Sequence, residues 1–73
     1  MKTAVTVILE QGADNWCAHA PDLEDIIIAT GDTREETITN FRNALRGLIK
    51  YKHEEGLPAP DITELEIGET VAA

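Results

Sequence analysis

The chain has 73 residues and a mass of 8.0 kDa, enough for one small domain and too little for two. Hydrophobic residues make up 42% of it, so they must be buried efficiently or shared with other chains to offset the entropy cost of folding. Six basic against fourteen acidic residues give a net charge of −8, whereas nucleic-acid binding needs clustered positive charge. We therefore expect no direct binding of nucleic acid. An acidic surface suits a basic partner, and equally serves plain solubility.

Several common classes of site are missing from the sequence. Cys17 is the only cysteine, so it cannot form an internal disulfide, and no Cys/His cluster has metal-ligand spacing. There is no serine and no glycine-rich phosphate loop, which excludes serine hydrolases and the common nucleotide-binding motifs. The N-terminal residues resemble neither a signal peptide nor a membrane span of about 20 apolar residues. We expect a cytoplasmic protein without metal, cofactor or membrane partner.

The first half of the chain predicts two strands joined as a hairpin. Thr3 to Glu10 alternates with period two and is rich in β-branched residues, and Asn15 to Ala20 forms the second strand after a turn that contains Gly12. Placing Glu10 opposite Asn15 assigns each strand a core face and an open face. The predicted core face carries Val5, Val7, Leu9, Trp16, Ala18 and Ala20, and the open face carries Thr6, Ile8, Cys17 and His19.

A third strand and a helix follow the polar connection after Pro21. Ile26 to Thr30 is a continuous apolar run, which is typical of a strand covered on both faces. Thr33 and Glu36 fit a capping box that starts a helix running to about Glu54. The helix has an apolar stripe of Ile38, Phe41, Ala44, Leu45, Leu48 and Ile49, with the stem of Lys52 beside it, and Gly56 and Pro58 end it.

The last predicted strand is Ile62 to Ile67, and Gly68 to Ala73 is predicted to be a frayed tail. The expected fold is therefore α+β, a single domain over residues 1–73 with an ordered core at about 3–67. It has the order β-β-β-α-β, a mainly antiparallel sheet and one helix on one face. One helix cannot cover both faces, so we expect the open face to mediate a homodimer or higher oligomer. The predicted interface residues are Thr6, Ile8, Cys17, His19 and Ile27.

A series of short motifs resembles the HicB antitoxin family. The motifs, in chain order, are Ala20-Pro21-Asp22-Leu23, Gly31-Asp32-Thr33, Glu35-Glu36, Asn40, Ala44-Leu45 and Gly56-Leu57-Pro58-Ala59-Pro60. The series spans roughly residues 3 to 67. The family's usual PDLPGC-like turn has no Pro-Gly pair in this chain, where Glu24 and Asp25 stand instead, and its usual EEA has become Glu35-Glu36-Thr37. The missing Pro-Gly pair leaves the register of the third strand open.

The resemblance implies a partial RNase H-like sheet and a role as antitoxin. In that family the domain binds a small basic HicA-type toxin that cleaves mRNA, and the acidic charge of this chain fits such a partner. The acidic turn of Asp22, Glu24 and Asp25 is then a candidate toxin-binding site. Many members carry a C-terminal DNA-binding segment, so we expect operator binding to be absent here or supplied by another chain. The alternative is an orphan homo-oligomeric scaffold protein that has no toxin.

Other candidate residues have structural explanations. Pro21, Asp22, Gly31 and Asp32 suit turns, Gly31 through access to positive φ. Cys17 and His19 share a strand face but have no visible orienting group, so we expect no catalytic pair. Glu10, Glu36 and Asp61 are not expected to converge on a nuclease metal site, so we predict a protein that is not an enzyme. The basic residues Arg42, Arg46, Lys50 and Lys52 suit a solvated helix face or contact with a phosphate or acidic partner.

Overall fold

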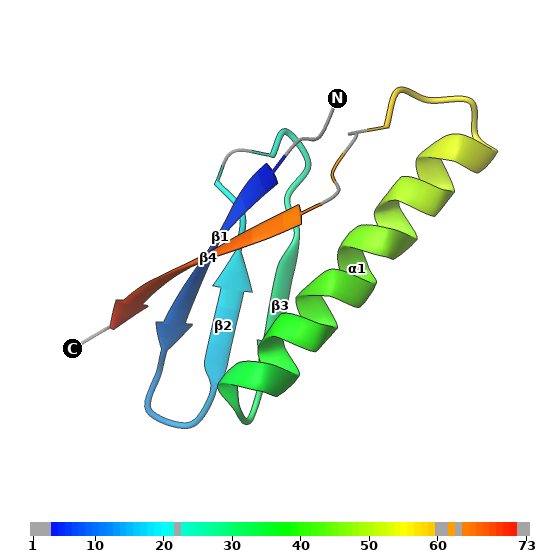
Figure 1. Ribbon diagram of the computed structural model, residues 1–73. Coiled ribbons are helices and arrows are strands. Elements are labelled where there is room, and N and C mark those ends of the chain that lie inside the picture. Colours follow the sequence, from blue (N-terminus) through cyan, green and yellow to red (C-terminus); the bar gives the residue numbers. More distant parts are fainter. Residues whose placement is uncertain (1–3, 22, 60–61, 63, 72–73) are drawn as a thin grey trace.

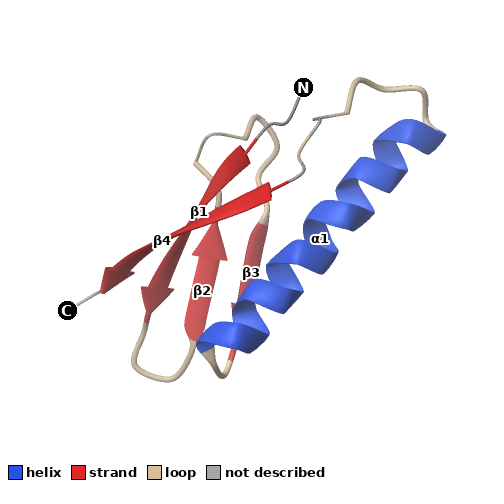
Figure 2. Ribbon diagram, viewed as in Figure 1, coloured by secondary structure: helices blue, strands red, loops and turns tan. Residues whose placement is uncertain are grey.

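The computed structural model describes residues 4–21, 23–59, 62 and 64–71. In this part of the chain the elements are, in order, β1 (Ala4–Gln11), β2 (Trp16–His19), β3 (Ile28–Gly31), α1 (Arg34–Glu54) and β4 (Glu64–Val71) (Figure 1). The strands form one mixed sheet in the spatial order β3-β2-β1-β4. The β1–β2 and β2–β3 pairs are antiparallel, and β1–β4 is parallel. The predicted α+β fold with the order β-β-β-α-β is confirmed (Figure 2).

The hairpin of β1 and β2 has the predicted faces but a different register. Leu9 lies opposite Ala18 and Gln11 opposite Trp16, so the pairing is shifted by two residues from the expected one. The four residues Gly12 to Asn15 form the turn, which is closed by the Gly12 amide donating to the Asn15 carbonyl at 2.7 Å. Because side chains alternate with period two, a shift of two residues leaves every side chain on its predicted face.

In the described part of the chain, β3 and the two residues before it are covered on one face only, which leaves the other face open as predicted. Ile27 and Ala29 are each 8% exposed and belong to the core, whereas Ile26 is 89% and Ile28 is 62% exposed. The expectation that Ile27 lies on the open face is therefore wrong, and Ile28 takes that place. The sequence pattern could not distinguish the two, because a continuous run of isoleucines has no alternation to assign its faces.

The start of α1 fits closely against the end of β3. Thr33 is the N-cap, and its side chain accepts a hydrogen bond from the Glu36 amide at 3.1 Å, as the capping box predicts. Thr37 is fully buried, and its hydroxyl donates to the Thr33 carbonyl at 2.8 Å. A Cβ on Gly31 would lie 2.6 Å from the Thr37 hydroxyl oxygen and 2.8 Å from its amide nitrogen. Gly31 therefore permits a close approach rather than the positive φ that was expected.

The end of α1 shows why Gly56 stands where it does. Gly56 has φ of 68°, a left-handed conformation that glycine adopts without steric cost. The Leu57 amide donates to the Lys52 carbonyl at 2.8 Å, and the Gly56 amide donates to the His53 carbonyl at 3.3 Å. This is the pair of hydrogen bonds of a Schellman motif, which satisfies the last helical carbonyls. The predicted end of the helix is confirmed.

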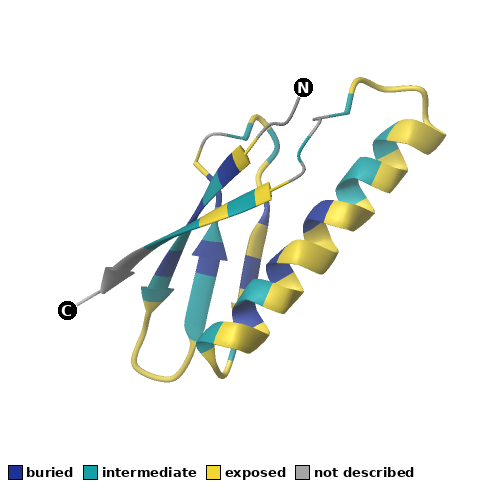
Figure 3. Cartoon of the chain, in the orientation of Figure 1, coloured by how far each residue is buried: buried dark blue, intermediate teal, exposed yellow. Residues whose placement is uncertain are grey.

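The core lies between α1 and one face of the sheet (Figure 3). The strands contribute Val5, Val7, Leu9, Ala18 and Ala29, the segments beside β2 and β3 contribute Ala20 and Ile27, and the helix contributes Phe41 and Leu45. Ala44 was predicted in the helix stripe but is exposed, because the stripe that packs on the sheet is narrower than the apolar sequence pattern. Gly68 to Val71 was predicted as tail but continues β4, where Val71 pairs with Gln11. Residues 72–73 of that tail lie outside the described residues.

Candidate functional site

The face of the sheet opposite α1 has an apolar row across its centre. Ile8, His19 and Ile28 lie side by side on β1, β2 and β3, because each is paired with the next in the sheet register. Gly68 on β4 completes the row, and a Cβ at Gly68 would lie 3.5 Å from Cδ1 of Ile8. Ile8 is therefore partly covered, whereas Ile28 stays 62% exposed. The row crosses four strands, with the apolar side chains of Ile8 and Ile28 on either side of His19.

The neighbouring rows add small and polar side chains. Glu10, Cys17 and Thr30 form the row toward the hairpin turn, and Thr6 is paired with Glu66 on the other side. Four of the predicted interface residues, Thr6, Ile8, Cys17 and His19, are thus brought together on the open face. Ile27 is the one that the structure places elsewhere. The exposure of Ile26 and Ile28 was not predicted, because the sequence does not specify the register of β3.

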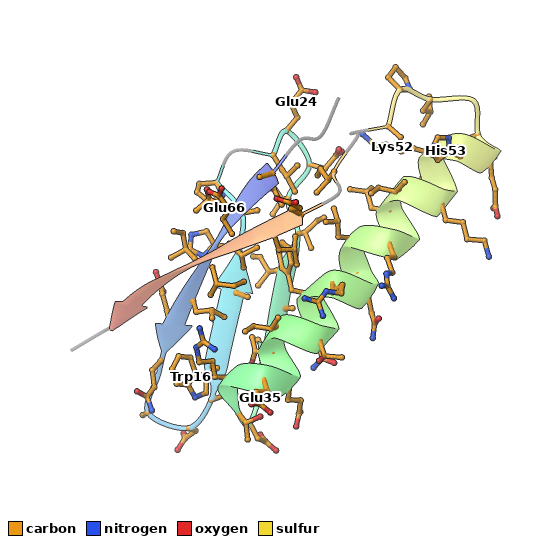
Figure 4. All side chains as sticks on the ribbon, in the orientation of Figure 1. Trp16, Glu24, Glu35, Lys52, His53 and Glu66 are labelled. Atoms are coloured by element: carbon orange, nitrogen blue, oxygen red, sulfur yellow. The ribbon has the colours of Figure 1, made fainter. Side chains whose placement is uncertain are left out.

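Charge is distributed unequally between the two faces of the sheet. Glu10 and Glu66 lie on the open face at its two ends, and Glu66 projects from β4 beside the sheet in Figure 4. The lysines and arginines of the described residues all lie on α1 instead: Arg34, Arg42, Arg46, Lys50 and Lys52. The open face is therefore apolar in its centre and acidic at its margin, with His19 as its one basic side chain among the described residues.

The described residues of the acidic turn before β3 have different environments. Glu24 is exposed and points away from the sheet (Figure 4). Asp25 instead forms an ion pair with Lys52 of α1, with 2.5 Å between Oδ2 and Nζ and side-chain exposures of 37% and 17%. The pair joins the turn to the helix, so Asp25 already has a partner within the chain. Asp22, the third predicted toxin-binding residue, lies outside the described residues.

The described residues considered for catalysis come from β1, β2 and α1. Cys17 is a free, half-buried cysteine on the open face, next to His19 along β2. Glu10 is on the open face of β1, Glu36 is exposed in the first turn of α1, and Asp61 lies outside the described residues. Within the described residues, no group of three or more His, Cys, Asp or Glu side chains could hold a metal ion.

A second concave surface lies on the other side of the sheet, between α1 and the start of β4. It is a groove of about 210 Å³ lined by Arg42, Leu45, Arg46 and Ile49 of the helix and by Ile62, Glu64 and Leu65. It arises because α1 lies closest to β3 and β2, which leaves β4 at the margin of the helix. Sequence analysis missed this groove because it depends on the placement of the helix.

Comparisons with protein-family models, curated proteins and solved structures found no match to the chain. The resemblance to the HicB family therefore rests on the sequence motifs alone. In the described part of the chain, no helix has the length and apolar character needed to cross a membrane.

Proposed function

We propose that this chain is a non-enzymatic binding module of antitoxin type, which uses the open face of its sheet to bind a small basic protein. The observation that supports this is the open face itself, with an apolar row of Ile8, His19 and Ile28 between Glu10 and Glu66. Contiguous apolar surface with a polar margin is typical of protein interaction sites. The acidic margin selects a basic partner rather than an acidic one.

The partner that the sequence motifs favour is a HicA-like toxin that cleaves mRNA. A toxin of that class carries positive charge to hold RNA, and the net charge of −8 on this chain would accelerate its encounter at low salt. Neutralisation then works by occlusion, because a bound antitoxin excludes RNA from the toxin's active surface. Of the acidic turn, Glu24 is the described residue left to assist the encounter, since Asp25 is paired with Lys52. Both proteins would act in the cytoplasm.

The alternative function is that of a homo-oligomeric scaffold without a toxin. Ile26 and Ile28, at 89% and 62% exposure, are large apolar side chains that a second copy of the chain could cover. This alternative uses the same face but requires no basic partner. Both functions use the same contact residues. They differ in the partner, which is a basic protein in one case and a second copy of the chain in the other.

The test is affinity purification of the tagged chain from its own cells, followed by mass spectrometry of co-purified small proteins and a salt titration. We expect a small basic protein that is released as salt rises, because salt screens the charge attraction. Its RNA cleavage in vitro should stop when the purified chain is added. Recovery of the chain alone, as an oligomer, would support the scaffold function instead.

Two variants locate the contact. Ile28→Arg places a positive charge in the apolar row and should abolish recovery of the basic protein. Ala44→Arg adds the same charge at an exposed position on α1, on the opposite side of the molecule, and should leave recovery unchanged. If both variants lose the partner equally, the open face is not the binding surface.

A further inference from the structure

The two edges of the sheet are protected very differently. Strand β3 is one edge, and it has only four residues. The side chain of Asn40 on α1 donates from Nδ2 to the Thr30 carbonyl at 2.8 Å, so a helix residue occupies one of its outward hydrogen-bonding groups. Short edge strands with occupied backbone groups resist pairing with other chains.

Strand β4 is the other edge, and it is longer than β3. It has eight residues, all in register with β1, and within the described sheet no strand lies on its outer side. Its outward amide and carbonyl groups are therefore positioned to pair with an added strand. Addition of an extended peptide to such an edge is a recurring mode of protein recognition.

The groove between α1 and β4 lies at this same edge. Its apolar lining comes from Leu45, Ile49, Ile62 and Leu65, which would receive the apolar side chains of an added strand. Arg42 and Arg46 line it from the helix, and they stand one turn apart with both side chains exposed. Lys50 pairs with Glu54 and Lys52 pairs with Asp25, whereas Arg42 and Arg46 make no ion pair within the described part of the chain.

We propose that the outer edge of β4 and this groove bind an extended segment of a partner protein as a fifth strand of the sheet. On its helix-facing side, the segment carries apolar side chains that enter the groove and acidic side chains that pair with Arg42 and Arg46. On its other side it carries neutral or basic side chains, because Glu66 lies on the open face of β4. This site is separate from the open face and does not rest on the function proposed above.

The charges of β4 argue against two other occupants. A second copy pairing through its own β4 would bring together two strands that each contain the exposed Glu64 and Glu66. Nucleic acid would be repelled by the same residues. An unrelated protein segment can instead place its acidic side chains beside Arg42 and Arg46 and its neutral or basic side chains beside the glutamates of β4.

The test uses two synthetic, fluorescently labelled peptides of about eight residues, the length of a typical strand. In the first, valine and glutamate occupy alternate positions on one side, and threonine and lysine occupy the other. The second has the same composition with the glutamates and lysines exchanged. We expect the first to bind about tenfold more tightly by fluorescence anisotropy, because only it places acidic and apolar side chains on the same side.

Variants and modified peptides then identify the contacts. The charge reversal of Arg42→Glu with Arg46→Glu should invert the preference for the two peptides. Lys50→Glu is the matched control, since Lys50 is equally basic, exposed and on α1 but does not line the groove. N-methylation of alternate peptide amides should abolish binding for one set and not for the other, because only alternate amides of an added strand face β4.

NMR chemical-shift changes should map to the β4 amides and to α1. Shift changes confined to the open face, equal affinities for the two peptides, or equal tolerance of both N-methylated sets would overturn the proposal. A dimer would also overturn the proposal if it protects the β4 amides from hydrogen exchange and is not displaced by the first peptide. In that case a second copy of the chain would occupy the edge.

Discussion

The two faces of the sheet differ in how far neighbouring residues of the chain are buried. Ile27 and Ile28 are neighbours of identical type, yet Ile27 is 8% exposed in the core and Ile28 is 62% exposed on the open face. The covered face gains its burial from α1, whose Phe41 is fully buried against it. The open face also carries apolar side chains, those of Ile8 and Ile28, but no helix of the described residues covers it. Exposure of these isoleucines is therefore decided by which face the helix covers.

The same comparison holds for charge. The helix carries the described lysines and arginines, while the open face ends in Glu10 and Glu66. In Figure 4 the labelled Glu24 and Glu66 project from the sheet and its turns, and Lys52 projects from the end of the helix. A basic partner would therefore contact the open face, and an acidic and apolar segment would contact the groove between α1 and β4. The two proposed contacts lie on different sides of the sheet.

The strongest test of the covered face is removal of its central side chain. Phe41→Ala should lower the free energy of unfolding by about 3–5 kcal/mol, because it deletes a fully buried aromatic ring and leaves a cavity. Urea denaturation followed by circular dichroism measures the change. Tyr51→Ala is the control, since Tyr51 is 55% exposed, and should cost less than about 0.5 kcal/mol. Equal losses would show that Phe41 does not anchor the helix.

The neighbouring isoleucines test the assignment of faces directly. Ile27→Ala should cost about 3 kcal/mol in unfolding free energy, as for other buried aliphatic side chains. Ile28→Ala should cost less than about 0.5 kcal/mol in the isolated chain, because its side chain is already in water. The two residues are neighbours in the chain and are identical in type. A reversed order of losses would mean that β3 is shifted by one residue.

Adding a methyl group at the close junction of β3 and α1 should lower the free energy of unfolding. Gly31→Ala should destabilise the chain by about 2 kcal/mol, because the new Cβ would overlap the backbone amide of Thr37 as well as its hydroxyl. Gly47→Ala, on the exposed side of the helix, meets nothing within 4 Å and should instead stabilise by about 0.5–1 kcal/mol. Thermal unfolding of both variants gives the comparison. Stabilisation by both would show that the junction is open.

The smallest expected effect concerns the ion pair between the turn and the helix. Lys52→Ala should cost about 1 kcal/mol, because it removes a partly buried partner of Asp25. Lys50→Ala removes only the exposed contact to Glu54 at 3.9 Å and should cost less than about 0.5 kcal/mol. A double-mutant cycle of Lys52 with Asp25, measured by urea denaturation, isolates the coupling. A coupling near zero would mean that the turn is not held by this pair.

Much of the fold followed from local patterns because those patterns have local physical causes. The Thr33 cap and the end of the helix at Gly56 depend on hydrogen bonds within a few residues, so they could be predicted. The faces of the hairpin were predicted correctly although the predicted register was wrong by two residues. The faces of the segment that enters β3 could not be predicted, since Ile26, Ile27 and Ile28 are chemically identical. The groove beside β4 was equally hidden, because it depends on where α1 lies over the sheet.

The sequence by itself determined the order of the elements, the ends of the helix and the acidic character of the chain. These depend on periodicity, capping residues and composition, which act over short distances along the chain. Only the tertiary structure decided that Ile28 faces solvent, that Asp25 is paired with Lys52, and that β4 continues past Gly68 as an open edge. Each of these depends on pairing between residues far apart in the sequence, which local patterns do not specify.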